Sequence, residues 1–68
     1  MRARLTKMQM QMLLDGKELT NVRQRFMIQQ GESEVRSILQ MAVDDPRFLK
    51  LFAVFLDFSN NQIVVEER

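Results

Sequence analysis

The run from Phe48 to Phe58 constrains the fold of this chain more than any other feature of its sequence. Large apolar side chains fill most of its positions, and Lys50 and Asp57 are the only charged residues inside it. A helix that is apolar around most of its circumference needs cover on more than one side. A chain of 68 residues can build only a small core. We therefore expect this run to be buried partly in the core and partly against a partner.

Helical spacing accounts for the apolar positions of the run. Asp44, Asp45 and Pro46 precede it, a combination typical of a helix start, because Asp accepts from free N–H groups and proline fits the first helical position. We predict a helix over residues 46–58, ended by Ser59-Asn60-Asn61. Its candidate core or interface residues are Phe48, Leu51, Phe52, Phe55 and Leu56.

A second helix is predicted over residues 33–43, just before this run. Val35, Ile38, Leu39 and Ala42 have the i, i+3, i+4, i+7 spacing of an amphipathic helix. Gly31 marks the break upstream, and the acidic residues near the predicted N-terminus suit the helix dipole.

The first thirty residues fit two different structures. As helices they show two apolar stripes separated by Asp15-Gly16, and the stripes consist of Leu5, Met8 and Met12, and of Leu19, Val22 and Phe26. As strands they show an alternating row, Met8, Met10, Met12 and Leu14, followed by a hairpin loop around Gly16. The abundance of good helix formers favours the helices.

These patterns predict one domain over residues 1–68. The favoured fold class is all-α, a small helical domain of three to four helices with a short extended C-terminal tail, residues 62–68. The alternative is α+β, with an N-terminal β-hairpin over 3–28, two helices over 33–43 and 46–58, and a short C-terminal strand.

The residue types exclude several kinds of site. The chain has no cysteine and no histidine, so Ser-His or Cys-His nucleophiles and the common zinc ligand sets are absent. The two glycines, Gly16 and Gly31, are too far apart to form a phosphate-binding loop. We predict no catalytic residues, no cofactor and no metal, and we interpret Asp44-Asp45 as a helix cap.

Charge is divided unevenly along the chain. Residues 1–30 hold six cations and two carboxylates, whereas residues 31–68 hold four cations and seven carboxylates. The basic half could face an anionic partner. The candidate contacts are Arg2, Arg4, Lys7, Arg23 and Arg25.

The sequence thus favours a non-catalytic protein–protein interaction or regulatory accessory protein. We expect it to form a homo-oligomer, a dimer in the simplest case, through the Phe/Leu-rich segment, and to bind another protein. The alternative is a small nucleic-acid-binding regulator that uses the basic half and dimerises through the C-terminal half. The longest apolar run, residues 51–56, is far shorter than a membrane span, and no signal-like apolar run follows the N-terminus. A cytoplasmic location without a membrane contact is therefore the expectation.

Overall fold

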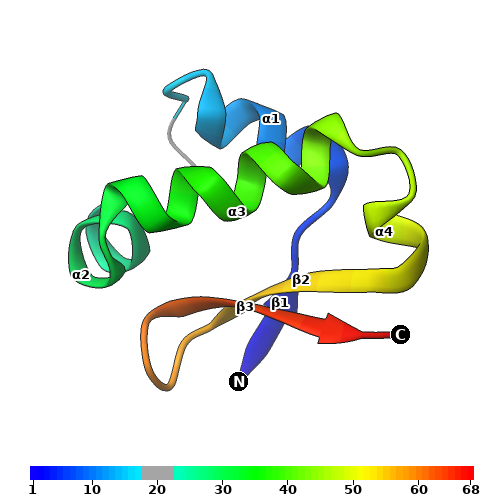
Figure 1. Ribbon diagram of the computed structural model, residues 1–68. Helices are drawn as coiled ribbons and strands as arrows, with labels where there is room; N and C mark the ends of the chain where they lie inside the picture. Colours follow the sequence, from blue (N-terminus) through cyan, green and yellow to red (C-terminus); the bar gives the residue numbers. More distant parts are fainter. Residues whose placement is uncertain (18–22) are drawn as a thin grey trace.

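The computed structural model describes residues 1–17 and 23–68, and in these residues the fold is α+β rather than all-α. Three antiparallel strands form one sheet in the order β1-β2-β3 (Figure 1). The strands are β1 (Arg2–Arg4), β2 (Phe52–Asp57) and β3 (Gln62–Glu67). The all-α prediction is wrong because the two ends of the chain meet on either side of the central strand β2.

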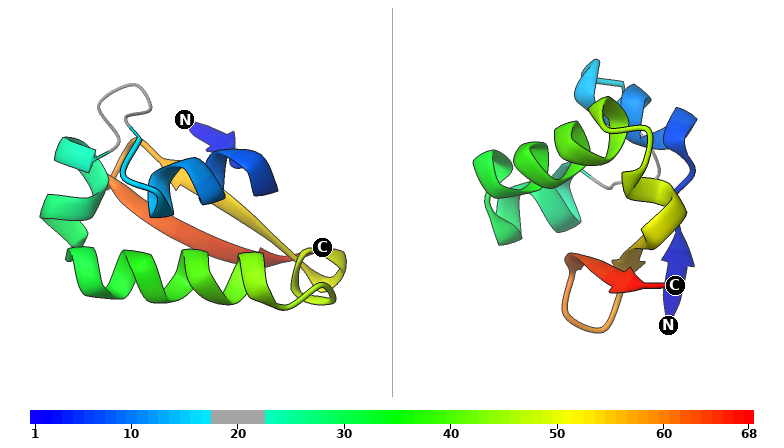
Figure 2. Two further views of the ribbon diagram at one scale, coloured as in Figure 1. Left: turned by 90° about the horizontal axis from the view of Figure 1, so that it is seen from above. Right: turned by 45° about the vertical axis from the view of Figure 1, so that its right-hand side comes forward.

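Helices cover one face of this sheet. They are α1 (Lys7–Leu14), the π-helical segment η1 (Arg23–Met27), α2 (Ile28–Gln30), α3 (Glu32–Asp44) and α4 (Phe48–Leu51). The long helix α3 and the shorter α1 lie on the same side of the strands, and α4 lies at one end of the sheet (Figures 1 and 2). No described element lies over the opposite face of the sheet.

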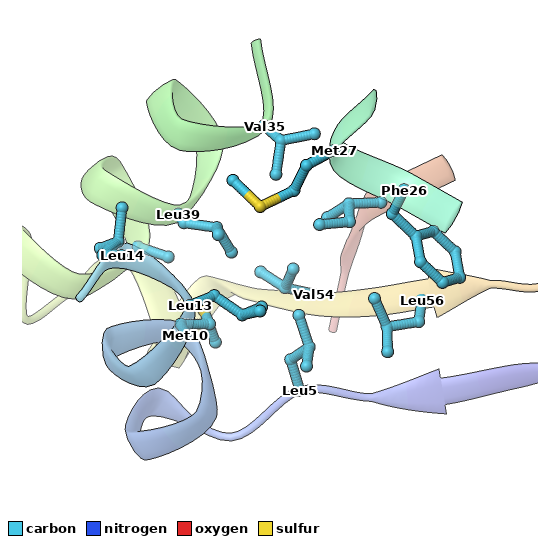
Figure 3. Close-up of a cluster of buried hydrophobic side chains, with 12 residues drawn as sticks. Leu5, Met10, Leu13, Leu14, Phe26, Met27, Val35, Leu39, Val54 and Leu56 are labelled. Atoms are coloured by element: carbon cyan, nitrogen blue, oxygen red, sulfur yellow. The ribbon is translucent and has the colours of Figure 1, made fainter. Parts of the chain in front are cut away.

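The hydrophobic core fills the space between the helices and the sheet. Figure 3 shows side chains from α1, η1 and α3 converging on β2, with Val54 near the centre. The largest of the described side chains that the fold buries completely, or almost so, are Met10, Leu13, Phe26, Met27, Val35, Leu39 and Val54. Apolar burial on this scale is the main stabilising contribution available to a chain without disulfides.

The hairpin predicted over 3–28 is wrong, because residues 7–14 form α1 and, of the residues described in this range, Arg2–Arg4 alone belong to a strand. Thr6 and Gln9 cap this helix reciprocally. The Thr6 hydroxyl accepts from the Gln9 N–H at 3.1 Å, and the Gln9 side chain accepts from the Thr6 N–H at 2.9 Å. At the other end, Gly16 has a φ of 83° and Lys17 donates its N–H to the Met12 carbonyl at 2.9 Å. This glycine-based C-cap replaces the predicted hairpin loop.

The buried face of α1 also differs from the predicted stripe. Met10, Leu13 and Leu14 are buried, whereas Met8 is 75% exposed. Five of the seven residues from 8 to 14 are apolar and they lie all around the helix, so spacing alone did not determine which side turns inward. Of the second predicted stripe, Phe26 is buried, while Leu19 and Val22 lie outside the described residues.

The helix predicted over 33–43 is confirmed as α3. It buries Val35, Leu39 and Ala42 and half-buries Ile38. Gly31 joins α2 to α3 with φ 115° and ψ 118°, a backbone conformation that residues other than glycine rarely adopt. The predicted break at this glycine is therefore a sharp corner between two helices.

The helix predicted over 46–58 is wrong. Only Phe48–Leu51 is helical, and the chain turns at Phe52 into the central strand β2. Because β2 carries apolar residues on both faces, its side chains fit the helical period and the strand period equally well. Asp45 does not cap α4, whose N-cap residue is Arg47 and has no side-chain cap bond; its carboxylate accepts from the Arg47 N–H at 2.9 Å in the turn before the helix.

The C-terminal segment is a strand, as the α+β alternative proposed, and it pairs with β2. In the register Leu56 faces Ile63 and Val54 faces Val65, on the helix-covered side. Asn61, with φ 53°, completes the turn between the two strands. Within that turn, the Asp57 carboxylate accepts from the Ser59 N–H at 3.0 Å.

Candidate interaction surfaces

The first candidate surface, the α4 corner, consists of Phe48, Leu51 and Phe52. The rings of Phe48 and Phe52 lie with centroids 5.1 Å apart, and both side chains are half-buried. Leu51 is one helical turn from Phe48 and is 61% exposed. The corner is therefore an apolar surface of which the core covers only part.

Charges of both signs flank the α4 corner. Arg68 donates its N–H to the Leu51 carbonyl at 3.0 Å and its Nε–H to the Phe52 carbonyl at 3.3 Å. Arg47 lies 4.0 Å from the Asp45 carboxylate. Lys50 is exposed on α4, and Glu67 faces Phe52 in the sheet register.

Two residues predicted to share this surface lie elsewhere. Leu56 belongs to the buried core. Phe55 points to the opposite face of the sheet from Val54 and Leu56, where it is half-buried. The structure thus brings together Phe48, Leu51 and Phe52 of the predicted set and separates the other two from them.

The second candidate surface, the basic flank, is made by β1, α1 and η1. These elements carry the five predicted anion-contact residues and contain no Asp or Glu. Arg2, Arg4, Lys7 and Arg25 are exposed, whereas the Arg23 side chain lies outside what the structure describes. The Met1 carbonyl accepts from the Phe58 N–H at 3.0 Å, and Arg25 lies over the Phe58 ring at 5.4 Å. Arg25 is therefore linked to the start of β1 through Phe58.

Arg2 is the one cation of this flank with carboxylate partners among the described residues. It hydrogen-bonds Glu66, lies 3.8 Å from the buried Asp57 carboxylate, and stands 6.0 Å from the Phe55 ring centroid. The hydrogen bond to Glu66 raises the pKa of the guanidinium above its ordinary value. Arg2 thus ties β1 to β3 across the outer face of β2, and Arg4 and Lys7 remain as cations without such partners.

The two edges of the sheet are protected differently. At the β3 edge, the Gln30 side chain accepts from the Ile63 N–H at 2.7 Å and donates to the Ile63 carbonyl at 3.3 Å. A side-chain amide thereby occupies the position of a neighbouring strand's peptide group. Sequence reasoning missed this contact, because a glutamine near a helix end has no pattern that indicates its partner.

At the β1 edge, no side chain among the described residues hydrogen-bonds to the outward peptide groups in this way. The Leu5 N–H donates to the Val54 carbonyl at 2.9 Å, so residues 1, 3 and 5 direct their peptide groups at β2. By alternation, the N–H and C=O groups of Arg2 and Arg4 point away from the sheet. No described residue bonds to these outward groups.

The described residues contain no group of three or more Asp or Glu side chains arranged to hold a metal ion. None of the helices they form is both long enough and apolar enough to span a bilayer. Comparison of the chain with protein-family models, with curated proteins and with solved structures found no match.

Proposed function

We propose that this chain is a non-catalytic interaction protein that self-associates through the α4 corner and acts by binding another protein. The observation that carries the proposal is the exposure of Leu51 beside the Phe48–Phe52 ring pair. When a partner covers an exposed apolar side chain and the two half-buried aromatic rings beside it, the buried apolar area stabilises the complex.

The mixed charges around the corner favour a second copy as the occupant. In a two-fold contact each surface meets its own copy, so a surface that carries both signs can complement itself. Lys50 and Arg68 of one copy can face Asp44, Asp45 and Glu67 of the other. A corner flanked by cations alone would repel itself.

The expected association is weak. A standard interface buries about 800 Å² on each partner, roughly a fifth of the 4479 Å² that this chain exposes. Three side chains do not supply that area. We therefore expect a monomer–dimer equilibrium with a dissociation constant of tens of micromolar, on the order of −6 kcal/mol.

Analytical ultracentrifugation over a concentration series tests the proposal with two variants. Leu51→Glu removes the exposed apolar group and places a carboxylate in the contact. Covering the exposed part of Leu51 is worth about 1.2 kcal/mol per copy, so losing it in both copies weakens the dimer about 50-fold. Met8→Glu changes an apolar residue on α1 that is 75% exposed, against 61% for Leu51, and serves as the matched control.

The expected result is loss of the dimer in Leu51→Glu only, with both variants melting at the wild-type temperature. A wild-type chain that stays monomeric at about 1 mM refutes self-association. A dimer that Leu51→Glu leaves unchanged places the contact elsewhere and refutes the role of the corner.

A nucleic-acid-binding regulator is the alternative function, and the carboxylate-free elements of the basic flank are the observation that favours it. Binding of a ten-nucleotide oligo-dT to the basic flank tests this alternative. A cytoplasmic location also belongs to this proposal, and the absence of cysteine supports a reducing compartment.

A further inference from the structure

The geometry points to the β1 edge as a site where an acidic, extended polypeptide segment binds as a fourth strand. This inference concerns β1 and its cations rather than the α4 corner, so it goes beyond self-association. It supplies the chemistry of the second protein partner.

The main chain of β1 provides the first part of the argument. Arg2–Arg4 is already extended and paired on one side, and the peptide groups of Arg2 and Arg4 point outward without a described partner. An extended segment laid antiparallel along β1 can form hydrogen-bonded pairs with both residues. The site ends at Thr6, whose N–H already donates to the Gln9 side chain.

The contrast with β3 provides the second part. Natural sheets protect their exposed edges against strand addition. In this chain the β3 edge is closed at Ile63, which donates one hydrogen bond to the Gln30 side chain and accepts another from it. The β1 edge carries arginines instead. Arginine repels a basic strand but attracts an acidic one, so this edge selects its partner by charge.

Side-chain alternation determines the sequence pattern of the partner. The side chains of Arg2 and Arg4 share the outer face of the sheet. In an antiparallel pair, residues directly opposite each other share a face. The partner should therefore place Asp or Glu opposite Arg4, which has no carboxylate partner among the described residues, whereas Arg2 already pairs with Glu66 and Asp57. The exposed Lys7, just beyond β1, extends the same preference.

A polypeptide fits this edge better than a nucleic acid does. Binding of single-stranded nucleic acid depends on exposed aromatic rings that stack on bases. The two rings next to β1, Phe55 and Phe58, are half-buried, and the cations of Arg2 and Arg25 lie near them at 6.0 and 5.4 Å from the ring centroids. The outward peptide groups of Arg2 and Arg4, which have no partner among the described residues, have the spacing to which another strand can hydrogen-bond.

The test measures binding of the labelled peptide Glu-Val-Glu-Val-Glu-Val to the full chain by fluorescence anisotropy in 50 mM salt. Arg4→Gln removes one charge and keeps the main-chain N–H. Arg4→Pro removes the same charge and also the outward N–H, at an edge position where proline leaves the pairing with β2 intact. Lys17→Gln, which removes an exposed cation just after α1 and away from the α4 corner, is the control, and melting curves verify that all three variants fold.

We expect Arg4→Pro to bind the peptide about fivefold more weakly than Arg4→Gln, because it lacks one further hydrogen bond. The gap should persist at 200 mM salt, which screens charges but not hydrogen bonds. Lys17→Gln should bind like the wild type. N-methylation of the glutamates, which face the arginines, should abolish binding, whereas N-methylation of the valines should leave it intact.

Three results would overturn the inference. The first is the absence of peptide binding at about 1 mM protein. The second is equal affinity of Arg4→Pro and Arg4→Gln, which means that charge alone attracts the peptide. The third is tighter binding of a ten-nucleotide oligo-dT that competes with the peptide. That result would identify the basic flank as a nucleic-acid site. Because Leu51→Glu does not alter β1, peptide binding at β1 and self-association at the α4 corner can fail independently, and the two experiments distinguish these failures.

Discussion

Replacing Gln30 with alanine tests whether one side chain closes the β3 edge. The substitution removes both hydrogen bonds to the Ile63 peptide group, at 2.7 and 3.3 Å. A hydrogen bond contributes about 1 kcal/mol net, and water can reach the vacated edge and satisfy part of the loss. We therefore expect Gln30→Ala to lower the free energy of unfolding by about 1.5 kcal/mol.

That loss is large for a chain of this size. A domain of 68 residues has a total stability of roughly 3–10 kcal/mol, and 1 kcal/mol shifts its melting temperature by about 4–8 °C. Thermal and urea denaturation should therefore show a drop of about 6–12 °C. Gln29→Ala is the matched control, since the neighbouring Gln29 makes only an exposed bond to Asn61 at 3.2 Å and should shift stability by less than about 0.5 kcal/mol.

Amide hydrogen exchange gives the residue-specific result. Ile63 and Val65 both direct their N–H groups away from β2, but only Ile63 has a described acceptor there. In the wild type the Ile63 amide should exchange more slowly than that of Val65, and in Gln30→Ala the two should exchange alike. If Ile63 stays protected in the variant, or Gln30→Ala melts like Gln29→Ala, the proposed closure of the edge is refuted.

Two further substitutions test the local structures that set the helix boundaries. Thr6→Ala removes the acceptor for the Gln9 N–H and should destabilise the chain by about 1 kcal/mol, whereas Thr6→Ser should restore most of the loss in the same urea titration. Gly31→Ala should destabilise by more than about 1 kcal/mol in thermal melts although nothing lies within 4 Å of the added Cβ, because alanine disfavours φ 115°. Equal stability of Gly31→Ala and the wild type would mean that the α2–α3 corner relaxes freely.

Local patterns in the sequence predicted the elements that depend on a single face. Helix α3 buries one stripe and exposes the other side, so its spacing identified it and its core residues. The C-terminal strand is rich in β-branched residues and was expected to be extended. In both cases the local preference agrees with the tertiary environment.

The same reasoning failed for β2 because its environment is apolar on both sides of the strand. Val54 and Leu56 face the helices, and Ala53 and Phe55 face the other way beneath Arg2 and Glu66. A central strand of this kind lacks the alternation that distinguishes strands from helices. Its assignment depends on β1 and β3, which lie at opposite ends of the sequence and which local spacing cannot bring together.

Of the two candidate surfaces, local sequence spacing explains the α4 corner, whereas the β1 edge depends on tertiary structure. Phe48 and Leu51 stay together because they are one helical turn apart, and Phe52 joins them as the C-cap whose N–H bonds to the Phe48 carbonyl, so sequence spacing predicted that grouping. The β1 edge could not be predicted, because it requires knowing that Arg2–Arg4 pairs with β2 on one side only. The cations of the N-terminal half were visible in the sequence, but their spacing along an open strand edge comes from the sheet. That spacing turns a general preference for anionic partners into a testable preference for an acidic strand.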